Sequence, residues 1–335
     1  MIYAKTKQEQ FAIKMQQTFE FKRAYAETRI NEFIKQSAQM GYETVVSVGG
    51  LDSIVLYCLI KTMGYNVPAV SVSSIEDKTV RAVHKQLNII DVKPMVSKYH
   101  ILKNIGYPIF SKETASKISV LQNPTEKNAP YRNAILTGQT TNAAKVKFSS
   151  ITKLPDKYIK LLYENPSPVK ISDKCCYYLK EIPVQKWCKN NNCLPFLGLH
   201  ADESKRRFMA LSSHGCNYFN GQKSRSAPFA IFTKSDILQL AIEINAPIPE
   251  IYGEIKRGKN GYYTTGAART GCDICGFGLQ FETTRPHRFD ILHDTDFKKW
   301  DFWVNQMEYG KLFKHIGFNY EYPYNVGDSA WKEVK

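Results

Sequence analysis

The sequence predicts an α/β fold built on a mostly parallel, doubly wound sheet. Two short apolar runs, Thr44–Val48 and Pro68–Ser73, are typical of buried strands. The run between them, Ser53–Met63, is apolar over the length of a helix and ends at Gly64. Strands that alternate with helices of this length need crossover connections, and such connections produce a parallel sheet.

The rest of the chain continues this alternation. Apolar residues recur at helical spacing between residues 11 and 40 and predict one or two amphipathic helices. A further helix is expected over residues 80–87, a third strand over Pro94–Ser97 and a later strand over Leu194–Leu199. These elements extend the predicted sheet on both sides of the first strand.

Changes in composition divide the chain into an N-terminal helical segment, an α/β domain and a helical, irregular C-terminal segment, expected at residues 1–40, 41–232 and 233–335. Within the α/β domain, a proline-containing basic insertion is expected at about residues 100–172. Thr233, with Asp236 three residues later, predicts the capped start of a helix over Lys234–Asn245. Near the C-terminus, an aromatic run between Phe297 and Tyr309 is expected to be core.

Charge and composition narrow the class of protein. The 335 residues include 46 Lys and Arg against 31 Asp and Glu, and residues 78–170 hold 16 basic and 5 acidic side chains. Such a surface attracts nucleic acid, although a solvated lysine-rich face would have the same composition. The longest apolar stretch, Ile54–Ile60, is far shorter than the roughly 20 residues of a membrane span. The N-terminal residues lack a secretory signal, so a cytoplasmic location with reduced thiols and no membrane partner is expected.

A glycine turn between the first strand and helix is the first candidate site. Residues 47–53 read SVGGLDS, which differs from both the GxxxxGKS/T and the GxGxxG phosphate loops. Gly49 and Gly50 allow close approach of an anion, the helix N-terminus supplies partial positive charge, and Ser53 adds a hydroxyl group. The same residues could form only a tight turn with Asp52 and Ser53 as helix caps.

Two pairs of cysteines form the second candidate site. Cys175 and Cys176 are adjacent, and Cys272 and Cys275 form a CxxC pair, which places two thiolates on one turn. A structural zinc ion or unliganded buried thiols are the alternatives to an iron–sulfur cluster. The other four cysteines stand apart from these pairs and are expected not to be ligands: Cys58, Cys188, Cys193 and Cys216.

These motifs resemble those of two related groups of proteins. The glycine turn resembles the SGGxDS loop of the PP-loop ATP pyrophosphatases, with Val48 at the position of the first serine and Ser47 beside it. Over roughly residues 41–289, four blocks occur in the order typical of the iron–sulfur phosphoadenosine phosphosulfate reductase family: KCCYYLKEIP, GLHADESKRR, PFAIFTKSDI and RTGCDICGFG. His200 stands where that family usually has arginine.

The resemblance implies specific ligands and residues. It implies that ATP or another adenine nucleotide, with Mg²⁺ as an accompanying ion, is held by Ser47, Gly49, Gly50, Asp52, Ser53, Ser73, Glu203, Ser204 and Arg207. Asp52, Lys180 and Arg207 are the implied catalytic residues. A 4Fe-4S cluster is implied on Cys175, Cys176, Cys272 and Cys275. Without the resemblance, the segment 203–207 is equally the start of an ordinary helix.

The positions of the cysteines bear on which reaction the chain could catalyse. The sulfonucleotide reductases use a cysteine near the C-terminus as nucleophile, and this sequence has no cysteine after Cys275. The nucleotide fold and the cluster also resemble those of sulfur-transfer enzymes that thiolate tRNA or the DNA backbone. This resemblance implies ATP-dependent sulfur transfer to a nucleic acid, tRNA or DNA, with a sulfur-donor protein as a further partner. The alternatives are sulfonucleotide reduction with a thiol from elsewhere, and a non-catalytic nucleotide-binding subunit of a nucleoprotein complex.

Overall fold

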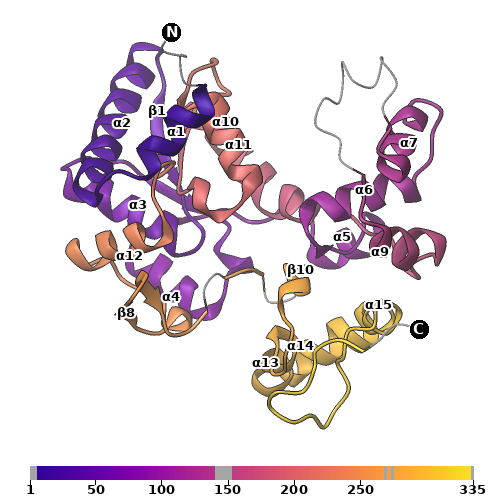
Figure 1. Cartoon of the computed structure of the whole chain (residues 1–335). Helices are drawn as coiled ribbons and strands as arrows, with labels where there is room; N and C mark the ends of the chain where they lie inside the picture. Colours follow the sequence, from indigo (N-terminus) through magenta and orange to yellow (C-terminus); the bar gives the residue numbers. More distant parts are fainter. Residues whose placement is uncertain (1–5, 140–152, 268–269, 273–274, 333–335) are drawn as a thin grey trace. The chain divides into compact units, whose positions relative to one another are not determined.

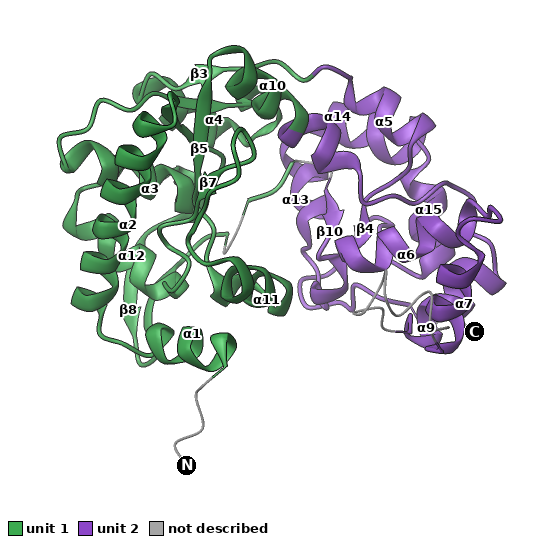
Figure 2. Ribbon diagram, turned by 90° about the horizontal axis from the view of Figure 1, so that it is seen from above, with its two compact units in different colours: residues 1–94, 182–272 green, residues 95–181, 273–335 purple. Residues whose placement is uncertain are grey.

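The computed structural model of the chain describes residues 6–139, 153–267, 270–272 and 275–332. The chain forms two compact units, each with its own core (Figure 2). Unit 1 comprises residues 1–94 and 182–272, and unit 2 comprises residues 95–181 and 273–335. The insertion expected at about residues 100–172 lies in unit 2, and the expected C-terminal segment is divided between the units.

Unit 1 is built on a six-stranded, mostly parallel sheet. Only the edge strand β6 runs antiparallel to its neighbour, so the predicted mostly parallel α/β sheet is confirmed. In spatial order the strands are β3 (Ile90–Asp91), β2 (Ala69–Ser71), β1 (Glu43–Ser47), β5 (Cys193–Leu197), β7 (Arg225–Ser226) and β6 (Asn217–Tyr218). The strand predicted over Pro94–Ser97 is wrong, since β3 lies at Ile90–Asp91. Pro94 lacks the amide that a strand ladder requires, whereas Ile90 is in register with Val70.

Helices flank this sheet (Figure 1). They are α1 (Lys7–Met15), α2 (Phe19–Gln39), α3 (Leu51–Thr62), α4 (Lys78–Gln86), α10 (Ile182–Asn190), α11 (Lys205–His214) and α12 (Lys234–Glu243). All residues of α3 from Ser53 to Ile60 are buried, which explains its apolar sequence. The predicted capping box at α12 is confirmed, because Thr233 and Asp236 each accept a hydrogen bond from the other's backbone amide. A hairpin of β8 (Ile255–Gly258) and β9 (Gly261–Thr264) completes unit 1.

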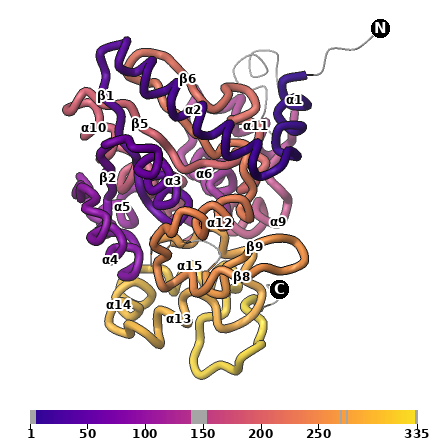
Figure 3. The backbone as a smooth tube through the Cα atoms, turned by 90° about the vertical axis from the view of Figure 1, so that its left-hand side faces the viewer, coloured from indigo at the N-terminus to yellow at the C-terminus, as the bar shows by residue number. Residues whose placement is uncertain are grey.

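The order of the strands identifies the place along the sheet at which a ligand site is expected. β1 lies between β2 and β5, with Ser47 in register with Val70 on one side and Leu197 on the other (Figure 3). The chain moves outward from β1 to β2 and β3, then returns to the opposite side of β1 as β5. Open α/β sheets bind ligands at such a switch point, outside the carboxyl ends of the strands. The segments that follow β1 and β5 are therefore the candidate site.

Unit 2 is mainly helical. Its helices are α5 (Lys98–Asn104), α6 (Lys112–Gln122), α7 (Ala129–Thr137), α9 (Asp156–Ile159), α13 (Arg288–Thr295), α14 (Phe297–Asp301) and α15 (Tyr309–Ile316), with π-helical turns η2 (Lys160–Glu164), η3 (Tyr177–Glu181) and η7 (Phe302–Gln306). β4 (Ile109–Phe110) pairs in parallel with β10 (Gly276–Phe277). Of the predicted aromatic run, Trp300 and Tyr309 are in the core, whereas Phe297 is exposed. None of the helices in the described part of either unit has the length and hydrophobicity to cross a membrane.

A buried ion pair stabilises the core of unit 2. The guanidinium group of Arg285 donates hydrogen bonds of 3.0 and 2.6 Å to the two carboxylate oxygens of Asp290, and Tyr322 donates a third of 2.9 Å. Burial raises the pKa of Asp290, but these bonds and the backbone amide of His287 outweigh it, so the pKa lies below its ordinary value. A buried charge is tolerated because it is paired and fully hydrogen-bonded.

We predict that Asp290→Asn lowers the free energy of unfolding by about 3–5 kcal/mol, because it leaves Arg285 buried without a counter-charge. The stabilisation by Asp290 should be present above the ordinary carboxyl pKa of roughly 4 and be lost as the pH falls through the lower folded-state pKa. Denaturant unfolding of the variant and the unmodified chain at neutral and acidic pH measures both effects. Glu308→Gln, which removes an exposed ion pair with Lys311, is the matched control. Equal losses in the two variants would contradict the prediction.

Candidate functional site

The glycine turn connects β1 to α3 at the switch point of the sheet. Gly50 is the N-cap of α3 and, as a glycine, offers no capping side chain of its own. The hydroxyl group of Ser53 accepts a hydrogen bond of 2.8 Å from the amide of Gly49 and donates one of 2.8 Å to the carbonyl of Gly50. Ser53 therefore fixes the path of the turn from inside the first turn of the helix.

Neighbouring segments pack directly against this turn. A Cβ atom on Gly198, just after β5, would lie 2.7 Å from the backbone nitrogen and Cα of Ser53. A Cβ atom on Gly50 would lie 2.6 Å from the hydroxyl oxygen of Tyr252 and 3.0 Å from that of Thr270. Glycine is required at both positions because the backbones or hydroxyl groups of the neighbours fill the space of a side chain.

The hydroxyl group of Tyr252 occupies the N-terminus of α3. It accepts a hydrogen bond of 3.1 Å from the amide of Leu51 and lies 2.8 Å from the hydroxyl oxygen of Thr270. Burial raises the pKa of Tyr252, so the group is a neutral phenol. An anion at this helix N-terminus would compete with Tyr252 for the Leu51 amide. Sequence reasoning missed Tyr252, which is about 200 residues away in an irregular segment.

Asp52 lies in a cluster of charged and polar groups. Its two carboxylate oxygens contact the ammonium group of Lys234 and, at 3.5 Å, Nε2 of His200. Burial raises the pKa of Asp52, but the contacts with His200 and Lys234 outweigh it and hold the pKa below its ordinary value. Asp52 is thus ionised at neutral pH. Sequence reasoning missed Lys234, whose only sequence signal is its place in the block PFAIFTKSDI.

His200 has an unsatisfied atom. The residue is 4 % exposed, and in the described part of the chain its Nδ1 atom has no hydrogen-bond partner. Buried polar atoms nearly always have a partner, so such an atom indicates a missing water or ligand. His200 follows β5, and its contact with Asp52 joins the two segments at the switch point.

Ser73 acts on the turn through a histidine. Its hydroxyl oxygen lies 2.9 Å from Nδ1 of His84, and Nε2 of His84 lies 2.8 Å from the carbonyl oxygen of Gly49. A carbonyl oxygen only accepts hydrogen bonds, so Nε2 of His84 donates to Gly49, and Nδ1 faces the hydroxyl group of Ser73. Ser73 was predicted to contact nucleotide, whereas the structure shows that it contacts the glycine turn through His84. His84 was not predicted.

The other predicted nucleotide contacts are only partly brought to the turn. Ser47 is half-buried at the end of β1. Ser204 is the N-cap of α11 and accepts a hydrogen bond of 3.3 Å from the amide of Arg207. The guanidinium group of Arg207 donates to Glu203 over 3.3 Å. The contacts that the structure gives for Arg207 are local, with Glu203 and Ser204, and none of them joins it to the glycine turn within the described residues.

Three of the four predicted ligand cysteines belong to unit 2. Burial raises the pKa of the Cys176 thiol, the Cys275 thiol adds to this, and Lys112 and Lys180 oppose it. Burial and the thiols of Cys275 and Cys175 likewise raise the pKa of the fully buried Tyr309. The three thiols therefore share one neighbourhood with Lys180, which was predicted, and with Lys112, which was not.

Cys272 ends unit 1, and residues 273 and 274 lie outside the described residues. Within the described ranges, no three His, Cys, Asp or Glu side chains are close enough together to hold a metal ion. The donors suit iron or zinc in kind, because both metals take thiolates.

The remaining cysteines are buried within unit 1. Burial raises the pKa of Cys58 to about 11 and that of Cys188 to about 12. The thiol of Cys216 lies 3.5 Å from the hydroxyl oxygen of Tyr25. Thiols with such pKa values are neutral at physiological pH and pack as small apolar groups.

Comparisons with known proteins add no family to these observations. No protein-family model matches the sequence, and no curated protein matches it.

We predict that Lys234→Met raises the pKa of Asp52, because it removes one of the two partners that stabilise the carboxylate against burial. Titration of the carboxyl carbon by nuclear magnetic resonance measures this shift. Lys205→Met, which removes an exposed lysine at the start of α11, should leave the pKa unchanged. An Asp52 pKa that is the same in both variants would show that Lys234 does not stabilise the carboxylate.

Proposed function

We propose that this chain is an ATP-dependent sulfurtransferase that activates an oxygen atom of a nucleic acid and replaces it with sulfur. The observation that carries the proposal is the glycine turn at the switch point. There, a helix N-terminus that begins at a glycine and whose Leu51 amide donates to the hydroxyl group of Tyr252 lies beside Asp52, Lys234 and the Nδ1 atom of His200, which has no hydrogen-bond partner in the described part of the chain. The motif resemblance to PP-loop enzymes supports the same assignment.

The turn offers what a polyphosphate needs. The amides at the start of α3 can donate to phosphate oxygens once an anion displaces the hydroxyl group of Tyr252 from Leu51. Lys234 would neutralise part of the phosphate charge, and a pyrophosphate leaving group would be stabilised in the same way. Asp52 is an ionised carboxylate, which is the kind of ligand that Mg²⁺ takes.

The proposed reaction has two steps. The acceptor oxygen attacks the α-phosphorus of ATP, and pyrophosphate leaves from the glycine turn. A sulfide equivalent from a sulfur-donor protein then attacks the activated atom, which is a carbon in a tRNA base and the phosphorus in a DNA backbone, and AMP leaves with the original oxygen. A 4Fe-4S cluster would be held by Cys175, Cys176, Cys272 and Cys275. When bound, it would take part in the delivery of sulfur to the acceptor. The basic region of residues 78–170 is the proposed contact for the acceptor.

We predict that Gly50→Val abolishes ATP binding and the formation of thionucleosides, because a Cβ atom at this position would lie 2.6 Å from the hydroxyl oxygen of Tyr252, in the space at the start of α3 that the phosphate requires. Binding is measured by calorimetry. The product is detected by mass spectrometry of nucleosides from tRNA or DNA after incubation with ATP and sulfide.

Gly258→Val is the matched control, because this glycine is exposed in the β8–β9 hairpin and its Cβ atom would approach the exposed ring of Tyr263 to 3.2 Å. Sulfite release from a phosphosulfate in place of a thionucleoside would identify a reductase. Tight nucleotide binding without any product would identify a non-catalytic subunit. Unchanged ATP affinity in the Gly50 variant would exclude the turn as the nucleotide site.

We predict that protein purified without oxygen contains iron and sulfide, and that Cys275→Ser loses both while Cys188→Ser keeps them. Cys275 shares its neighbourhood with Cys175 and Cys176, whereas Cys188 is packed among apolar residues of unit 1. Metal and sulfide analysis of the three proteins measures this. Stoichiometric zinc without iron in the unmodified protein would contradict the prediction.

A further inference from the structure

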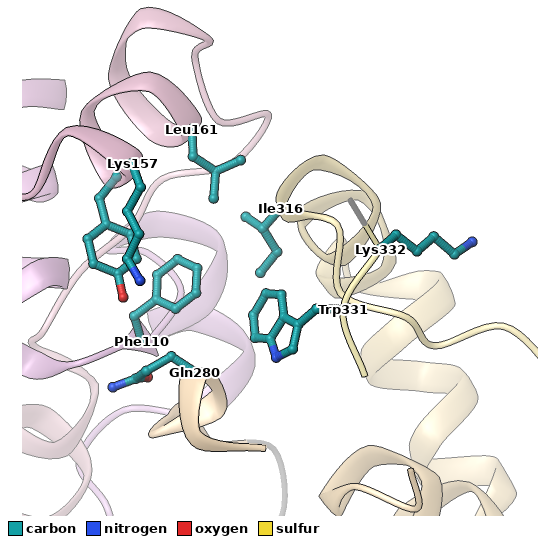
Figure 4. A pocket seen from close by; sticks show the side chains of 8 residues that line it. Phe110, Lys157, Leu161, Gln280, Ile316, Trp331 and Lys332 are labelled. Carbon is teal, nitrogen blue, oxygen red and sulfur yellow. The ribbon is translucent and has the colours of Figure 1, made fainter. Parts of the chain in front are cut away.

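Unit 2 contains a cavity that plays no part in the sites described above. Its volume is about 280 Å³, and it is lined by Phe110, Lys157, Tyr158, Leu161, Gln280, Ile316, Trp331 and Lys332 (Figure 4). Small-molecule sites in proteins start at roughly 300 Å³, so this cavity suits a single ring system rather than a large ligand. In Figure 4, Leu161 and Phe110 lie opposite Ile316 and Trp331.

The walls of the cavity are aromatic. The ring of Phe110 lies 4.8 Å from that of Tyr158 and 6.0 Å from that of Trp331, between centroids, and is nearly parallel to the indole ring. Phe110 is buried, while Tyr158 and Trp331 are half-buried and keep part of their surfaces open. These rings offer stacking surfaces to a planar group.

The backbone at Phe110 is strained. Its φ angle is +59°, in the left-handed region that a bulky residue rarely adopts. The pairing of β4 with β10 and a hydrogen bond of 2.5 Å from the amide of Gly278 to the carbonyl of Phe110 hold it there. Strained residues of this kind cluster at ligand sites, where the surrounding structure maintains them.

Polar groups accompany the aromatic walls. The exposed Lys157 has its ammonium group 4.9 Å from the centroid of the Tyr158 ring. Lys332 forms an ion pair of 2.7 Å with Glu321, and Figure 4 shows it extending outward from the Trp331 side. Oε1 of Gln280 is buried and has no hydrogen-bond partner in the described part of the chain. The site therefore combines ring surfaces, one amide and the cation Lys157, which has no ion pair with another residue of the described ranges.

We propose that this cavity binds a single unstacked nucleobase, with the attached phosphate at Lys157. A base has a ring face for Tyr158 and Trp331, polar edges for Gln280 and a phosphate for Lys157. An apolar side chain of a partner protein would satisfy only the first of these. The inference rests on the proposed function in one respect, that the base belongs to the nucleic acid acceptor. Free mononucleotides carry the same chemistry.

The test uses the full chain and short single-stranded RNA and DNA that carry a fluorescent label. Trp331→Leu should weaken binding by about 10-fold, since stacking of one base on an aromatic side chain contributes that order of affinity. Trp331→Phe should retain most of the affinity. Lys157→Gln should weaken binding and reduce the salt dependence by roughly 0.7 in the slope of log affinity against log salt, as expected for one phosphate.

Matched controls separate the cavity from general effects. Trp303→Leu removes another half-buried tryptophan of unit 2, and Lys298→Gln removes an exposed lysine of α14, and neither residue lines the cavity. Both should bind as the unmodified chain does, and every variant should keep its ATP affinity. Thermal unfolding identifies any variant that is not folded. Competition by free mononucleotides shows whether the base and one phosphate are sufficient, and its absence shows that neighbouring nucleotides are needed.

Photocrosslinking locates the base independently of any variant. Oligonucleotides that contain 5-iodouracil should crosslink to Tyr158 or Trp331 when irradiated, as identified by peptide mass spectrometry. If the unmodified chain binds oligonucleotides but crosslinks only elsewhere, and Trp331→Leu binds equally well, the cavity is not a base site and the proposed function stands. If the unmodified chain binds no oligonucleotide, both proposals are overturned.

Discussion

The parallel pairing of β1 with β5 is the constraint on which the candidate site depends. Five consecutive residues of each strand are in register, from Glu43 with Cys193 to Ser47 with Leu197. This register sets the backbone of Gly198 against Ser53 and brings His200 to Asp52. A shift of one residue would turn the side chains to opposite faces of the sheet and separate these contacts. The glycine turn is therefore shaped by a strand that lies about 150 residues away in the sequence.

The site balances two opposing requirements. A helix N-terminus that attracts anions exposes amides that need partners. In this structure Ser53 satisfies Gly49, and Tyr252 satisfies Leu51. A phosphate group would replace the neutral hydroxyl group of Tyr252 with a charged acceptor, which makes a stronger hydrogen bond. Asp52 and Lys234 already compensate each other's charge, so a bound polyphosphate or metal ion would have to redistribute this pair.

The sequence predicts what depends on local patterns. The apolar runs at Thr44–Val48 and Ser53–Met63, and the capping pair at Thr233, correspond to β1, α3 and the start of α12 because each is set by residues close in the chain. The third strand was misplaced because a two-residue strand has too few residues to show an alternating pattern.

Contacts between distant residues could not be predicted in this way. Lys234, Tyr252 and His84 reach the glycine turn only through tertiary packing. No motif marks Tyr252 or His84, and Lys234 is marked only by its place in the block PFAIFTKSDI. The division into two units could not be predicted from the sequence either, because each unit consists of two segments that are far apart in the chain. Arg207 was expected at a phosphate from the resemblance alone. In the structure it pairs with Glu203, which directly precedes the N-cap residue of α11.

The most direct measurement of the central claim is the exchange of labelled pyrophosphate into ATP. Attack of an acceptor oxygen on the α-phosphorus is reversible as long as pyrophosphate and the activated acceptor remain at the site. The account predicts that label enters ATP only when the chain, Mg²⁺ and an acceptor tRNA or DNA are all present and sulfide is withheld. Bound nucleotide and nucleic acid without any exchange, or the formation of ADP and phosphate, would contradict it.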